Sequence, residues 1–120
     1  EGEQGFRDRE TKVLEAIIQT SPSSIIATGG GIILRRENRT TLQENGQVVY
    51  LSATKEQLYE RTKRDKSRPL LQVDDRRSVI DRLVEKRDPL YREIADLTFP
   101  SGSIQPNRIA KKLAEALSEL

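Results

Sequence analysis

The spacing of apolar residues predicts a helix and then a buried strand in the first part of the chain. Over residues 6–19 apolar side chains recur at helical spacing, and the Ser-Pro-Ser sequence at 21–23 would end that helix. The apolar run at residues 24–28 is continuous rather than alternating, which is typical of a strand covered on both faces of a parallel sheet. The inner face predicted for the helix consists of Phe6, Val13, Leu14, Ile17 and Ile18.

The middle of the chain repeats this alternation. A helix is predicted over about residues 36–44, ending in a C-cap at Asn45-Gly46, and a second buried strand over residues 47–51. Thr54, with Gln57 three residues later, has the spacing of a capping box at the start of another helix.

The second half contains two further helices and a short strand. A helix starting near residue 76 places Arg87 on the same face as four aliphatic side chains, and residues 88–91 are expected to begin a separate short helix. A weak strand is predicted at residues 97–99, and Pro106 suits the first turn of the last helix. Residues 1–120 are therefore predicted to form one α/β domain, with a parallel sheet between two helical layers.

Composition narrows the chemistry that is open to this chain. There is no histidine and no cysteine, which excludes thiol nucleophiles, histidine bases, disulfides and nearly all zinc sites. Twenty-one basic and nineteen acidic residues give a net charge of +2, which indicates no nucleic-acid partner. No uncharged run approaches the ~20 residues that cross a bilayer, so we expect a cytoplasmic protein without a membrane partner. The lack of methionine indicates a piece of a longer chain.

The three glycines after the first predicted strand are one candidate binding element. At the end of a parallel strand, Gly29, Gly30 and Gly31 would let backbone amides approach a ligand closely, although a tight strand-to-helix turn would also explain them. The phosphate-loop pattern G-x-x-x-x-G-K-[ST] does not occur in these residues.

Two arginines are candidates for anion binding. Arg7 and Glu10 are neighbours at i, i+3 on a helix, so Glu10 could orient the guanidinium for a carboxylate, or the two could form a solvated surface pair. Arg87 continues an apolar stripe and therefore requires either a buried anion or a path by which its head reaches solvent.

A basic segment follows the capping-box helix. Without aromatic residues for base stacking nearby, a phosphate clamp on a mobile loop at about residues 64–75 fits it better than a nucleic-acid patch, while a merely solubilising helix end remains open. Its cations are Arg61, Lys63, Arg64, Lys66 and Arg68.

The order of these motifs closely resembles shikimate kinase, a family of nucleoside-monophosphate-kinase-like P-loop enzymes. The resemblance is carried by F-R-x-x-E at residues 6–10, A-T-G-G-G at 27–31, R-P-L-L at 68–71 and R-x-P-L-Y at 87–91. It implies transfer of the γ-phosphate of ATP, with Mg²⁺, to the 3-hydroxyl of shikimate in aromatic amino acid biosynthesis. It also implies the P-loop kinase type of α/β fold.

The same resemblance implies roles for individual residues. Arg7 and Arg87 would hold the shikimate carboxylate, with Glu10 supporting Arg7, and Gly29, Gly30 and Gly31 would lie against the substrate ring. On the nucleotide side, Arg68 would be the catalytic lid arginine that reaches the ATP phosphates. Arg61 would stack near adenine, and Gln105 would make the second adenine contact.

The resemblance also implies that this chain is the C-terminal part of the domain. The family's phosphate loop and Asp-x-Asp strand end would precede Glu1, so no metal ligand is expected in this chain. In the family's sheet order, 2-3-1-4-5, residues 24–28 and 47–51 would pair through the strand that precedes Glu1, so we expect open sheet edges, a split core and no activity from this piece alone. The complete enzyme is expected to be a monomer.

Two other functions remain open from the sequence. One is a related small-molecule kinase of gluconate type, which the pairing of Arg7 with Arg87 disfavours. The other is a non-catalytic paralogue without a phosphate loop that binds a metabolite.

Overall fold

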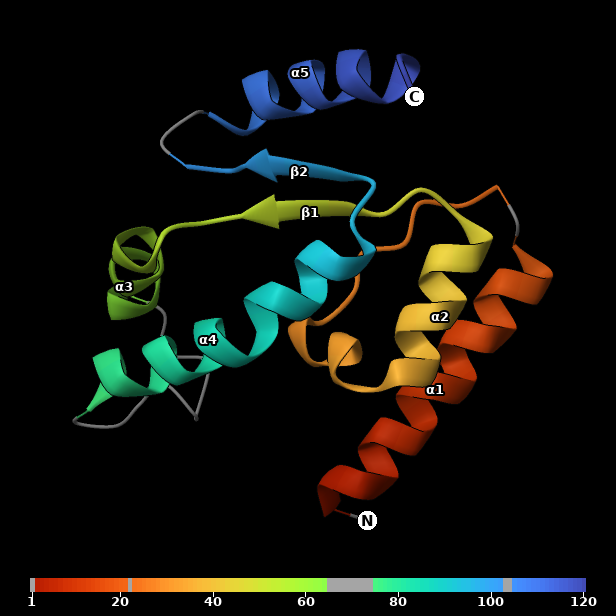
Figure 1. The fold of residues 1–120 in the computed structure, drawn as a ribbon, viewed down its shortest axis with the longest axis horizontal. Helices are drawn as coiled ribbons and strands as arrows, with labels where there is room; N and C mark the ends of the chain where they lie inside the picture. The colour runs from red at the N-terminus through yellow and green to blue at the C-terminus, as the bar shows by residue number, and fades with distance from the viewer. Residues whose placement is uncertain (1, 22, 65–74, 103–104) are drawn as a thin grey trace.

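The computed structural model describes residues 2–21, 23–64, 75–102 and 105–120 (Figure 1). In these ranges α-helices and two strands alternate along the chain, with one short 3₁₀ helix, η1, near the glycines. The elements are α1 (Gly2–Thr20), η1 (Gly30–Leu34), α2 (Arg36–Asn45), β1 (Val49–Ser52), α3 (Lys55–Arg64), α4 (Arg76–Ile94), β2 (Leu97–Pro100) and α5 (Pro106–Ser118).

The two strands form a parallel pair, as the alternation of helices and strands predicts. Val49 lies opposite Leu97 and Ser52 lies opposite Pro100, and α3 and α4 make the connection between the strands (Figure 1). The Asp96 carboxylate accepts a hydrogen bond from the Val48 amide at 2.7 Å, which fixes the strand starts together.

The prediction of a strand at residues 24–28 is wrong. This segment has no strand assignment, and the side chain of Ile25 is fully exposed. The prediction that the strand at 47–51 is buried is also wrong, because β1 leaves Leu51 half exposed. In the described part of the chain the sheet contains β1 and β2 alone, so residues 24–28 have no ladder partner and β1 has one open edge.

Helix α1 forms as predicted, and its packed stripe agrees with the predicted inner face in part, at Leu14 and less closely at Ile17 and Ile18. Thr11 and Leu14 are buried, whereas Phe6 and Val13 are more than half exposed. The packed stripe is therefore Arg7, Thr11 and Leu14, at i, i+4 and i+7, and it lies against η1 and α2. Packing follows this stripe because it is the one that the glycine turn and α2 cover.

Helix α4 runs unbroken from Arg76 to Ile94, so the predicted restart at residues 88–91 is wrong. Pro89 removes one backbone N–H from the helix but does not end it. Ile80 and Ile94 are both buried, so packing holds the helix on each side of the proline. As a consequence, Arg87 and Tyr91 lie one turn apart on a single helix.

At the other helix ends, the predicted capping box and the predicted first-turn proline are confirmed, and the predicted C-cap is not. The capping box is complete, since the Thr54 amide donates to Gln57 Oε1 at 2.9 Å and the Gln57 amide donates to Thr54 Oγ1 at 3.1 Å. Pro106 occupies the first turn of α5. The exception is Gly46, whose φ of −174° is extended, so α2 ends there without a left-handed cap.

Part of the packed interior surrounds the 3₁₀ helix η1, which the sequence did not predict, and another part lies between α3 and α4. Asn38, almost fully buried on α2, donates from Nδ2 to the Ile32 carbonyl at 3.0 Å, and Arg39 donates to the Ile33 carbonyl at 2.9 Å. These bonds fix the position of η1 at Ile32 and Ile33. The buried apolar side chains are Leu14, Ile32, Ile33, Tyr59, Ile80 and Ile94.

Candidate functional site

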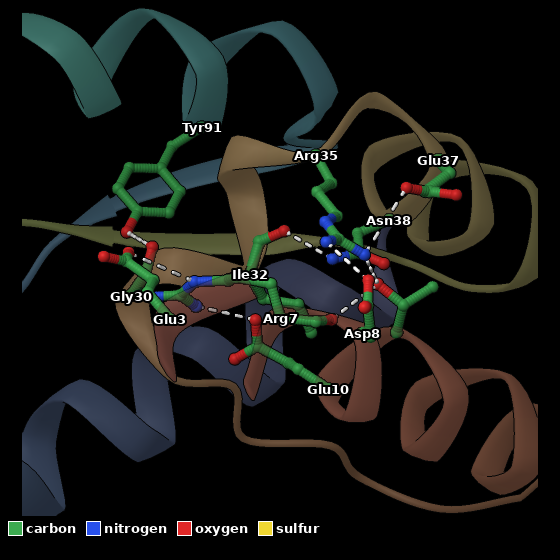
Figure 2. Close-up of polar contacts among 11 residues, drawn as sticks. Glu3, Arg7, Asp8, Glu10, Gly30, Ile32, Arg35, Glu37, Asn38 and Tyr91 are labelled. Carbon is green, nitrogen blue, oxygen red and sulfur yellow. Dashed lines mark hydrogen bonds and ion pairs between the residues drawn. The ribbon is translucent and has the colours of Figure 1, made fainter. Parts of the chain in front are cut away.

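Arg7 lies directly against the glycine turn. A Cβ built on Gly31 would lie 2.5 Å from Arg7 Cζ, much closer than two such carbon atoms approach. Position 31 therefore accepts only glycine while Arg7 keeps this place. The turn is also tied to α1 from the other side, because Arg35 donates to Asp8 Oδ1 at 2.7 Å and to Thr11 Oγ1 at 3.4 Å (Figure 2).

Arg7 and Glu10 form a shielded ion pair rather than a solvated one. Arg7 Nη1 donates to Glu10 Oε1 at 2.7 Å, and the two side chains are only 18% and 15% exposed. Figure 2 shows Glu10 on one side of the guanidinium and the glycine turn on the other. Arg7 Nε is buried, lies 3.7 Å from Glu3 Oε1, and makes no hydrogen bond within the described residues. Glu10 thus orients Arg7 without saturating its donors.

Arg87 approaches the same turn from α4. A Cβ on Gly30 would lie 3.1 Å from Arg87 Nη1 and 3.2 Å from the Tyr91 hydroxyl oxygen, so both side chains touch this glycine. The guanidinium is half-buried, as the apolar stripe predicts, and its Nε is buried without a hydrogen bond to the described part of the protein. Two arginines from different helices therefore flank consecutive glycines.

Tyr91 belongs to this site, although the sequence motif assigned it no role. Its hydroxyl donates to the Gly30 carbonyl at 2.6 Å, and Figure 2 shows the side chain reaching from α4 to the turn. Burial raises the pKa of Tyr91 while the neighbouring Arg87 lowers that pKa, and the net effect is a rise. The hydroxyl therefore stays protonated near neutral pH. The sequence feature that could have pointed to Tyr91 is its i, i+4 spacing from Arg87 on one helix.

These contacts make the glycine turn a candidate anion site. Guanidinium groups bind carboxylates through two parallel N–H···O bonds. Arg7 is paired with Glu10 and with the largely exposed Glu3, whereas Arg87 makes no ion pair among the described residues. The predicted substrate residues Arg7, Glu10, Gly29, Gly30, Gly31 and Arg87 are brought together here, with Gly29 nearest to Glu10.

The residues predicted to bind the nucleotide are not brought together in the way that the substrate residues are. Arg61 on α3 donates to Ser101 Oγ at 3.2 Å, beside a hollow of about 310 Å³ that Arg61, Gln57 and Gly102 help to line. Gln105 is exposed at the start of α5 and does not line that hollow. Arg68 and nearly all of the predicted lid at 64–75 lie outside the described residues.

Comparison with known proteins decides the family. The family model described as shikimate kinase matches residues 1–118. The chain belongs to the shikimate kinase family.

Individual relatives in this family agree. The chain is 46% identical over 119 residues to the shikimate kinase of Francisella tularensis subsp. holarctica, covering 99% of this chain and 68% of the relative. It is 46% identical over 118 residues to the shikimate kinase of a Marinomonas species, covering 98% of this chain and 65% of the relative.

Solved structures of shikimate kinases have the same fold. The Acinetobacter baumannii enzyme in complex with shikimate matches with a TM-score of 0.82 and 42% identity, over 98% of this chain and 66% of that one. The Bacteroides thetaiotaomicron enzyme matches with a TM-score of 0.81 and 28% identity, over 99% of this chain and 70% of that one. These matches confirm the predicted P-loop-kinase type of α/β fold. The chain spans about two thirds of the length of its relatives.

No cluster of potential metal ligands is present among the described residues. Within them, no group of three or more acidic side chains is placed to hold a metal ion. The glycine turn is unsuitable as well, because Arg7 and Arg87 present cationic donors rather than the oxygen ligands that Mg²⁺ requires.

Among the described residues, no helix is both long and apolar enough to cross a bilayer.

Proposed function

We propose that this chain is part of an enzyme that transfers the γ-phosphate of ATP to the 3-hydroxyl of shikimate, giving shikimate 3-phosphate for aromatic amino acid biosynthesis. The observation that supports this most is the convergence of Arg7 and Arg87 on Gly30 and Gly31. The chain belongs to the shikimate kinase family, whose model matches residues 1–118, and this supports shikimate as the anion that the two arginines bind.

The shikimate carboxylate would bind between the two guanidiniums. Arg7 is already oriented by Glu10 at 2.7 Å, so little side-chain freedom would be lost when the anion binds. Arg87 would complete the grip from α4, where its Nη1 approaches Gly30. Because Gly29, Gly30 and Gly31 carry no Cβ, the ring could lie against their backbone, with its hydroxyls directed away from the arginines.

We assign nucleotide binding to the hollow between α3 and Gly102. Arg61 would lie near adenine beside the hollow at Gly102, with Gln105 as a further contact, and Arg68 would act on the phosphates. Phosphoryl transfer depends mainly on positioning and charge neutralisation, so a chain without histidine is suited to it.

Magnesium would neutralise phosphate charge in the complete enzyme, which we propose to be a cytoplasmic monomer. Its ligands are assigned to the phosphate loop and the Asp-x-Asp strand end that the family resemblance places before Glu1. Because residues 1–120 contain no G-x-x-x-x-G-K-[ST] sequence, we expect this piece alone to release no ADP from ATP.

A coupled assay of ADP release by the full-length protein tests the proposal. We expect release that depends on shikimate, with mass spectrometry and ³¹P NMR identifying a phosphate ester at the 3-hydroxyl. Gluconate serves as the control substrate and should give no turnover. Turnover of gluconate but not shikimate would support the related kinase, and shikimate binding without turnover would support a non-catalytic paralogue.

A further inference from the structure

Tyr91 and Arg87 lie one turn apart on α4 and contact the same glycine. The Tyr91 hydroxyl donates to the Gly30 carbonyl at 2.6 Å, and the Cβ position of Gly30 lies 3.1 Å from Arg87 Nη1. The tyrosine therefore binds the backbone of the turn at the point where the arginine approaches it. Neither the sequence motif nor the carboxylate-binding model gives this hydroxyl a task.

The ring of Tyr91 is held in one orientation by a second tyrosine. Tyr50, on β1, stacks on it with ring centroids 4.7 Å apart and an interplanar angle of 26°. Tyr50 is fixed in turn, because its hydroxyl donates to Asp88 Oδ1 at 2.5 Å while Arg92 Nε donates to Asp88 Oδ2 at 2.9 Å. The Tyr91 hydroxyl is thus aimed by the sheet and by its own helix together.

The Gly30 peptide needs such a partner. Three successive glycines leave the backbone of the turn with more conformational freedom than any other residues would. Within the turn, the Ile32 amide reaches the Gly29 carbonyl at 3.3 Å, which is a long bond. Without the tyrosine, the peptide between Gly30 and Gly31 could rotate and move the surface on which Arg7 and the substrate lie.

We infer that Tyr91 is a positioning residue of the substrate site, whose hydroxyl fixes the Gly30 peptide beside Arg87 and thereby sets the affinity for the carboxylate substrate. The inference rests on the proposed function. Tyr91 acts through the glycine and not on the substrate. Its loss is therefore expected to affect shikimate binding and to leave nucleotide binding unchanged.

Tyr91→Phe in the full-length protein is the direct test, since it removes the hydroxyl and keeps the stacked ring. One positioning hydrogen bond corresponds to roughly a 3- to 10-fold change in affinity, so calorimetry with shikimate should give a Kd higher by that factor. KM for shikimate should rise alongside, with kcat and KM for ATP unchanged. Equal shikimate affinity in the variant and the wild type would overturn the inference.

Tyr59→Phe is the matched control. Tyr59 also donates its hydroxyl, in this case to the Asp81 carboxylate, but it lies on α3 where that helix packs against α4, away from the glycine turn. It should keep wild-type shikimate affinity. If it loses as much as Tyr91→Phe, the effect is general destabilisation and the inference is wrong.

Two further measurements make the test independent of the stability of one variant. In a double-mutant cycle with Gly30→Ala, the losses from Tyr91→Phe and Gly30→Ala should not add, because both act on one peptide; additive losses would contradict the inference. In Tyr91→3,5-difluorotyrosine the phenol ionises nearer neutral pH, so shikimate affinity should fall as pH rises through that ionisation. An affinity that follows the wild type across this pH range would also overturn it.

The outcomes separate the two proposals. If the wild type itself does not bind shikimate, the proposed function fails. If the wild type binds shikimate and Tyr91→Phe binds it equally well, the proposed function stands and the positioning role of Tyr91 fails.

Discussion

The guanidinium of Arg7 occupies the space in which a side chain at position 31 would begin, with Arg7 Cζ 2.5 Å from the Cβ position of Gly31. Gly31→Ala should therefore push Arg7 away from Glu10. We expect shikimate affinity to fall at least ~10-fold, the equivalent of ~1.4 kcal/mol, in calorimetric titration of the full-length protein.

Gly46→Ala is the control for that substitution. Gly46 has no atom within 4 Å of its Cβ position and an extended φ of −174°, so alanine should be accommodated there without loss of affinity. If Gly31→Ala binds shikimate as tightly as Gly46→Ala does, Arg7 does not contribute to the site from this position.

Arg87→Ala should abolish measurable shikimate binding while nucleotide binding persists. Removing one partner of a shielded, hydrogen-bonded charge pair costs on the order of 2–5 kcal/mol, which is more than about 30-fold in Kd. Titration with shikimate and with an ATP analogue, each in separate experiments, measures the two affinities.

Arg82→Ala on the same helix is the matched control. Arg82 is exposed and bonds the Ser78 carbonyl one turn back, so its removal should change neither affinity. If Arg87→Ala keeps its shikimate affinity, the assignment of Arg87 to the shikimate carboxylate is wrong.

Asn38→Ala should destabilise the protein and weaken substrate binding together. Its side chain is 1% exposed and donates to the Ile32 carbonyl, so the substitution leaves a buried acceptor unpaired, at a cost of roughly 1–3 kcal/mol. Urea unfolding and shikimate titration give the two readouts.

Asn45→Ala serves for comparison, because Asn45 ends the same helix with an exposed side chain that bonds the Thr41 carbonyl. We expect it to lose much less stability and no affinity. Similar losses in both variants would show that η1 does not depend on the buried amide.

Asp88 should make the stability of the protein depend on acid pH. The Tyr50 hydroxyl bond holds the pKa of Asp88 below its ordinary 3.8, Arg92 lowers that pKa further, and partial burial opposes the shift. A depressed folded-state pKa stabilises above the unfolded value, and that contribution is lost as pH falls from about 4 through the folded pKa. The free energy of unfolding should therefore drop on acidification more steeply in the wild type than in Asp88→Asn.

Tyr50→Phe tests the cause of this shift. Without the hydroxyl, the pKa of Asp88 should return toward 3.8, and the difference from Asp88→Asn across acid pH should shrink. Parallel unfolding curves for the wild type and Asp88→Asn from pH 5 to pH 2 would contradict the assignment.

The sequence by itself determined the elements whose signals are local. Helical periodicity located α1, α2, α4 and α5, the Thr54–Gln57 spacing located the start of α3, and the apolar stripe of α4 placed Arg87 on the inner face. Each of these signals operates within one or two turns of chain, where the interacting residues are also neighbours in sequence. The motif order was enough to predict the family as well.

Only the tertiary structure decided the features that depend on partners far along the chain. Residues 24–28 are apolar enough for a strand but have no ladder partner in the described chain, and α4 passes through Pro89 because packing holds both sides. The spacing of Arg7 and Glu10 is the same in a solvated pair and in a shielded one, and contact with Gly31 made the difference. The hydrogen bond from Tyr91 to Gly30 spans 61 residues, so no local pattern could reveal it.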